Sequence, residues 1–165
     1  MADHPAAGTP PQAPLRTTAS RVDVRRAGPA DAAAVLAMVR EIAAHEGTPD
    51  AVAGDLGTWT AMLARPDVVV LLAERDGEPA GYVSAVRRLH LWLGRDILGL
   101  DDLFVRAGFR DAGVGRLLMT ELGALAAREG LAVRWEVRED NVAAQRFYRR
   151  LGADLRTKVV AFWRP

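Results

Sequence analysis

The sequence predicts an α/β fold in which one mixed β-sheet lies between helices. Strand-like and helix-like segments follow one another irregularly and without an internal repeat, which favours a single sheet covered by helices. The apolar residues also change their period along the chain. Residues 131–137 alternate between apolar and charged, as in a half-buried strand, whereas residues 114–125 carry an apolar stripe typical of a helix lying on a sheet.

Length and composition predict one domain. The chain has 165 residues, of which 50% are hydrophobic, enough for one well-formed core. Residues 1–20 hold four prolines and no aromatic residue, so they cannot bury enough surface to offset the entropy of ordering. We therefore expect a disordered leader over residues 1–20 and a single domain over residues 21–165.

The composition also argues against several classes of function. The 22 basic residues balance 21 acidic ones, so no nucleic-acid partner is expected. No apolar run approaches the roughly 20 residues that span a bilayer, and no signal pattern is present, so no membrane association and a cytoplasmic location are expected. The absence of cysteine excludes a thiolate nucleophile, and three scattered histidines give no reason to expect a metal site.

The first half of the domain is expected to form a strand, two helices and a β-hairpin. Valines alternate with charged residues in the first strand, and apolar residues recur at helical spacing in the first helix. An uninterrupted apolar run indicates a strand that is covered on both faces, and Asp76-Gly77 marks a tight turn. The expected ranges are strand 21–27, helix 30–45, weaker helix 52–64, strand 68–72 and strand 79–89.

The second half is expected to alternate strands and helices. Gly130 and Gly152 supply helix stops, and Asn141 is a good N-cap. The expected ranges are strand 97–105, helix 116–129, strand 131–137, helix 142–151 and a last strand 155–163.

The most informative segment reads RDAGVG and covers residues 110–115, between the strand and the helix. Glycines at 113 and 115 allow a tight turn and close approach of a ligand. The first amides of the next helix have no intrahelical acceptor and can bind phosphate oxygens. Because Leu118 stands where a third glycine would be needed, the segment is not a dinucleotide fingerprint. We interpret it as a pyrophosphate-binding turn.

Two motifs in fixed order, DDLFVRAGFRDAGVGRLL at 101–118 and WEVREDNVAAQRFYRRLGA at 135–153, resemble those of the GCN5-related N-acetyltransferase (GNAT) superfamily. The chain looks most similar to its diamine branch, the spermidine/spermine and thialysine acetyltransferases. That likeness rests on the acidic pair before Phe104, the turn at 92–94 and Glu46. The resemblance implies a mixed, mostly antiparallel sheet with helices on both faces, and acetyl-CoA as co-substrate.

The resemblance also implies roles for individual residues. Tyr148 is the expected general acid and Asp101 the expected base, while Glu46, Asp102 and Trp92 are expected to bind the acceptor. One departure is Asp111, a carboxylate beside the place where phosphates should bind. The residues expected to bind acetyl-CoA are Phe104, Val105, Arg110, Asp111, Ala112, Gly113, Val114, Gly115, Arg116 and Asn141.

These assignments predict an N-acetyltransferase that moves an acetyl group directly to a primary amine of a small molecule, either a diamine or an amino acid side chain. Two alternatives stay open: an acetyltransferase of protein N-termini or lysines, and a non-catalytic acyl-CoA-binding module. Trp92 and its apolar neighbours form either a partner surface or a packed strand end, and the resemblance favours a homodimer. Residues 103–105 and 133–137 are expected to separate and admit the pantetheine arm.

Overall fold

The computed structural model describes residues 21–161 and 163, and its centre is a five-stranded sheet in the order β1-β2-β3-β4-β5. Every neighbouring pair is antiparallel except β4 and β5, which run parallel. This confirms the expected mixed, mostly antiparallel sheet. The strands are β1 (Val22–Arg26), β2 (Val68–Arg75), β3 (Glu78–His90), β4 (Arg95–Val105) and β5 (Ala132–Arg134).

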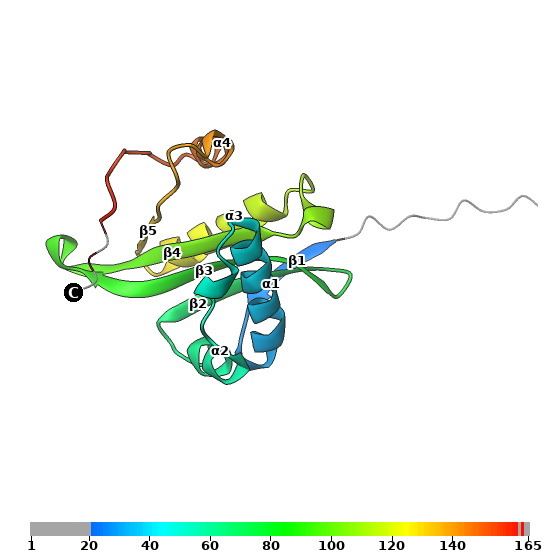
Figure 1. Cartoon of the computed structure of the whole chain (residues 1–165). Coiled ribbons are helices and arrows are strands. Elements are labelled where there is room, and N and C mark those ends of the chain that lie inside the picture. The colour runs from blue at the N-terminus through cyan, green and yellow to red at the C-terminus, as the bar shows by residue number, and fades with distance from the viewer. Residues whose placement is uncertain (1–20, 162, 164–165) are drawn as a thin grey trace, which may run out of the picture.

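Helices cover both faces of the sheet (Figure 1). Helices α1 and α2 pack on one face, α3 packs on the other, and α4 lies beyond the end of β5. The helices are α1 (Ala32–His45), α2 (Leu56–Leu63), α3 (Val114–Arg128) and α4 (Val142–Arg150), with short 3-10 turns η1 (Pro29–Asp31), η2 (Pro49–Ala51), η3 (Leu91–Leu93) and η4 (Ala107–Phe109).

Two apolar cores hold these layers together. On the α3 face, Leu118 and Leu122 are fully buried against sheet residues such as Val83. On the other face, Met38 of α1 packs with Tyr82 of β3. The central strands contribute side chains to both cores, which explains why residues 68–72 form an uninterrupted apolar run.

The hairpin of β3 and β4 contains the irregularity that shapes the site. The register shifts between Val83 and Ala85, so that Ser84 of β3 faces both Asp101 and Asp102 of β4. Such a β-bulge adds one residue to a strand and redirects its side chains. The backbone N–H of Asp102 is satisfied by the Ser84 hydroxyl, at 3.1 Å.

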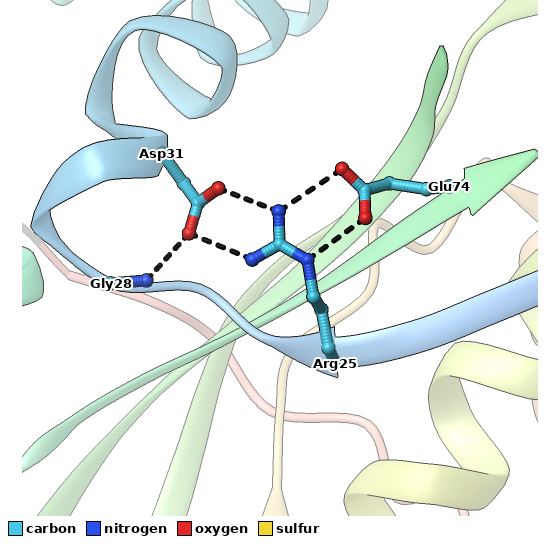
Figure 2. A network of polar contacts seen from close by, with 4 residues as sticks. All are labelled: Arg25, Gly28, Asp31 and Glu74. Carbon is cyan, nitrogen blue, oxygen red and sulfur yellow. Dashed lines mark hydrogen bonds and ion pairs between the residues drawn. The ribbon is translucent and has the colours of Figure 1, made fainter. Parts of the chain in front are cut away.

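A charged network fastens β1 to the rest of the sheet (Figure 2). The Arg25 guanidinium donates to both oxygens of Asp31, at 2.7 and 2.9 Å, and to both oxygens of Glu74, at 2.8 and 3.0 Å. Asp31 also accepts from the Gly28 backbone N–H at 2.8 Å. Arg25 thereby ties the turn before α1 to strand β2, using the two-pronged geometry that guanidinium and carboxylate share.

Three expected elements need correction. The second helix begins at Leu56 and not at residue 52, because Asp55 is its N-cap and accepts from the Thr58 N–H at 2.8 Å. The strand expected over 131–137 ends at Arg134, where its pairing with β4 ends. The last strand is wrong in the described residues, because 155–161 and Trp163 belong to no ladder. The expected leader, residues 1–20, lies outside the described residues.

Candidate functional site

The turn between β4 and α3 has the backbone that a phosphate-binding turn needs. Asp111 and Gly113 both adopt positive φ, 62° and 78° respectively. Gly113 is the N-cap of α3 and provides no side chain, so no side-chain cap satisfies the first amides of that helix. Arg110 donates from Nε to the carbonyl of Val105, at 3.2 Å, and so joins the turn to the end of β4. The expected anion-binding turn fits this geometry.

Gly115 lies where three elements meet. A Cβ placed there would be 3.6 Å from Cγ2 of Val105 and 3.8 Å from Cζ of Phe147. The end of β4, the start of α3 and helix α4 are therefore in close proximity. A larger residue at 115 would fill the space between them, in front of the amides that are expected to bind the co-substrate.

Strands β4 and β5 part beside this turn. They pair only from Ile97 with Ala132 to Gly99 with Arg134, whereas β4 continues to Val105. The expected separation of 103–105 from 133–137 is confirmed. The edge of β4 that faces away from β3 thus offers backbone donors and acceptors to an extended ligand, as sheet edges do in strand addition.

Tyr148 lies on α4 with its ring in a small aromatic cluster. Its ring centroid is 5.0 Å from that of Trp135 and 5.3 Å from that of Phe147. Only 8% of the residue is exposed, and this burial raises the pKa of its hydroxyl above the ordinary 10.0. Within the described part of the chain, the hydroxyl has no hydrogen-bond partner. Tyr148 is therefore protonated at neutral pH, as a general acid must be.

The other residues expected at the co-substrate site differ in their surroundings. Asn141 is the N-cap of α4, and its side-chain oxygen accepts from the Ala144 N–H at 3.0 Å. Phe104 is buried against Tyr82 in the α1 core, which leaves its backbone as the group available to a ligand. Ala112 and Arg116 are exposed, whereas Val114, the first residue of α3, is buried.

The acidic pair occupies the bulge of β4, on the face that α1 covers. Asp102 is half-buried and accepts from the Tyr82 hydroxyl at 3.3 Å. Burial first, and then the charges of Asp101 and Glu46, raise the pKa of Asp102, while the bonds from Tyr82 and Ser84 oppose this rise. Burial also raises the pKa of Asp101, against the lowering effect of Arg88. A raised pKa makes these carboxylates better proton acceptors.

The structure brings most of the expected acceptor residues together. Glu46 caps the end of α1, and its charge raises the pKa of both Asp102 and Tyr82. Trp92 is not brought to this group, because it lies in η3 at the far end of the hairpin with 95% of its surface exposed. The homodimer expected through the Trp92 tract stays a prediction.

Sequence reasoning missed Tyr82 and Ser84. Both lie on β3. Ser84 is opposite the acidic pair, and Tyr82, whose ladder partner is Phe104, is fully buried. A signal was present, because a tyrosine inside an apolar strand requires a polar partner for its hydroxyl. That the partner is Asp102 depends on the register between β3 and β4.

Two general properties complete the description. None of the helices in the described residues is long and apolar enough to cross a membrane. Among those same residues, no group of histidine, cysteine and carboxylate side chains could hold a metal ion.

The fold and this site define the class of the molecule, an α/β domain of the acyltransferase type. A family model described as the acetyltransferase (GNAT) family matches residues 36–153, which include the β4–α3 turn, the acidic pair and Tyr148. The chain belongs to this family.

Comparisons with individual proteins agree with this family assignment. L-ornithine N5-acetyltransferase NATA1 of Arabidopsis thaliana is 32% identical over 77 residues, covering 46% of this chain and 34% of the relative. The chain thus matches about a third of that protein's length. An aminoglycoside acetyltransferase, meta-AAC0020, from an uncultured soil metagenomic sample has a TM-score of 0.76 at 17% identity, covering 87% of this chain and 95% of that one. Aminoglycoside N-acetyltransferase AAC(6')-Iy, solved with CoA, has a TM-score of 0.74 at 21% identity, covering 92% and 99%. At these identities the two structures establish the shared fold.

Proposed function

We propose that the protein is an acetyl-CoA-dependent N-acetyltransferase that acts on a primary amine of a small molecule, a diamine or an amino acid with a side-chain amine. The observation that carries this proposal is the arrangement along β4, which holds the acidic pair at its bulge and leads into the phosphate-type turn. The relatives, an ornithine acetyltransferase and two aminoglycoside acetyltransferases, support an amine acceptor.

The co-substrate is proposed to lie between β4 and α4. The amides of Gly113, Val114 and Gly115 would face its pyrophosphate, because the helix starts there without a side-chain cap. The free edge of β4 near Phe104 and Val105 would bind the pantetheine arm and polarise the acetyl carbonyl. Arg110 and Arg116 supply positive charge on either side of the turn.

The chemistry requires a neutral amine, whereas an unperturbed alkyl ammonium has a pKa of about 10.4. Asp101 is proposed to take the proton, directly or through water, so that the nitrogen can attack the acetyl carbon. A new C–N bond forms as the C–S bond breaks, and the thiolate that leaves takes the proton of Tyr148. Transfer is direct within a ternary complex, and a cysteinyl acyl-enzyme is excluded because the chain has no cysteine.

Asp102 and Glu46 are proposed to bind the acceptor through a second ammonium group. Tyr82 donates to Asp102 and favours its ionised form, since this hydrogen bond opposes the rise in its pKa. The cluster of carboxylates on the α1 face favours a small cationic acceptor. A protein substrate would instead require an open groove.

Thiol release from acetyl-CoA tests this function. The purified chain would be assayed with ornithine, putrescine, an aminoglycoside and a peptide with a free N-terminus. Acetylation of one of the small amines, lost in Asp101→Asn, supports the proposal. Acetylation of the peptide alone would assign the chain to the protein-directed alternative, and release with none of the acceptors would contradict transferase activity on these amines.

A further inference from the structure

Arg88 lies on the same face of the sheet as the acidic pair. It is an even number of residues from Ser84 along β3, so both side chains point to the α1 face. Its partner in the ladder is Ile97 of β4. Arg88 is therefore further from the co-substrate turn than Asp101 is, along the same pair of strands.

Gly99 makes room for the Arg88 side chain. A Cβ at Gly99 would lie 3.1 Å from Nε of Arg88, so the arginine extends across β4 over this glycine. Asp101 follows two positions along the strand, which corresponds to about 7 Å. Arg88 is near enough to lower the pKa of Asp101 against the effect of burial.

No side-chain hydrogen bond or ion pair of the described residues holds the Arg88 guanidinium. Its neighbour Arg87 differs, because it binds Asp96 at 2.7 Å and Glu129 at 2.8 Å. The N–H groups of the permanently charged Arg88 guanidinium are thus available to a ligand at the edge of the carboxylate cluster.

We propose that Arg88 binds a carboxylate of the acceptor, so that the preferred acceptor is a diamino acid rather than a plain diamine. This inference rests on the proposed function. The reacting amine would lie at Asp101 and the carboxylate at Arg88, whose Nε lies over Gly99. Gly99 and Asp101 are about 7 Å apart along the strand, a span that a four-carbon chain can bridge. Guanidinium and carboxylate form a paired, charge-assisted contact, which a plain diamine cannot make because it has no carboxylate.

The test compares ornithine with putrescine, which is ornithine without its carboxylate. We expect kcat/KM of the wild type to favour ornithine by about tenfold or more, the effect of a hydrogen bond to a charged group. In Arg88→Ala, the ratio of kcat/KM for ornithine to kcat/KM for putrescine should fall by about 10- to 100-fold, because any change at Asp101 affects both acceptors alike. Arg88→Lys should keep part of the preference, since it retains the charge without the fork.

Arg128→Ala is the matched control, because Arg128 is an exposed arginine in the last turn of α3 on the opposite face of the sheet. It should leave the ratio of the two kcat/KM values unchanged, and thermal unfolding would verify that each variant is folded. If both proteins turn over and the ratio of kcat/KM for ornithine to that for putrescine is the same in wild type and Arg88→Ala, the inference is overturned and the proposed function stays intact. Absence of transfer to every small amine overturns both.

Discussion

Tyr148 combines a buried ring with a hydroxyl that has no hydrogen-bond partner among the residues that the structure describes. The ring packs on Trp135 and Phe147, while burial raises the pKa of the phenol. A tyrosine serving only to fill the core would lose little by becoming phenylalanine, since the ring contacts remain. A tyrosine that donates a proton would lose this function in the same substitution, although its ring would still pack.

Tyr148→Phe is therefore expected to lower kcat by about ten- to a thousandfold, the usual contribution of a general acid. Acetyl-CoA affinity and the temperature of unfolding should stay close to those of the wild type. Steady-state kinetics and calorimetry measure the two effects separately. An unchanged kcat would remove Tyr148 from the mechanism.

Asp111 is the residue at which the turn is least suited to an anion. It has a positive φ of 62°, which costs most residues other than glycine about 1 kcal/mol, and it places a carboxylate beside the start of α3. Asp and Asn tolerate this backbone better than other side chains because they are short and polar.

Two substitutions separate the charge of Asp111 from its backbone strain. Asp111→Asn should tighten acetyl-CoA binding by about two- to fivefold by removing the repulsion of an exposed charge. Asp111→Gly should do the same and also raise the free energy of unfolding by up to about 1 kcal/mol. Calorimetric Kd values and urea titrations measure both quantities. Weaker binding in both variants would mean that the carboxylate contributes a favourable contact.

At the scale of elements, the Arg25 network anchors β1. The guanidinium of Arg25 holds the pKa of Asp31 below its ordinary value of 3.8 in the folded state. A group whose pKa is lowered by folding stabilises the protein above its unfolded pKa, and this contribution is lost as pH falls through the folded pKa.

Arg25→Ala should accordingly reduce the free energy of unfolding by about 1 kcal/mol at pH 7, a value that allows for solvent screening of the partly exposed pair. The difference from wild type should shrink as the pH falls below about 4. Urea unfolding at pH 7 and pH 3 measures it, with Arg21→Ala as control, because the Arg21–Asp23 pair is largely exposed. A difference that grows on acidification would contradict the linkage.

The element boundaries show what local sequence can predict. The spacing of the apolar residues and the identity of the turn residues were sufficient to predict β2, the Asp76-Gly77 turn and α1. The prediction of a last strand was wrong because a strand needs a partner: segments 133–137 and 154–160 both line an open cavity of about 460 Å³ and form no ladder with each other. Alternating side chains indicate an extended backbone but do not say which edge it joins.

At the scale of the whole molecule, β4 organises the site. Its start faces Arg88, its bulge carries the acidic pair, and its end leads into the β4–α3 turn. The motifs in the sequence were sufficient to place the turn and the acidic residues. The contacts of Tyr82 with Asp102 and of Arg88 with Gly99 could not be predicted from the sequence, because they depend on the register of two strands and on a bulge.

The central claim is that the β4–α3 turn binds acetyl-CoA, and calorimetric titration tests it most directly. Wild-type protein should show saturable binding at one site, well above the response to acetate together with adenosine 3′,5′-bisphosphate. Gly113→Val should bind much more weakly while remaining folded, because a β-branched residue is strained at a φ of 78° and its side chain takes up open space expected to hold the phosphates. No heat of binding, with an unchanged temperature of unfolding on adding acetyl-CoA, would contradict the account.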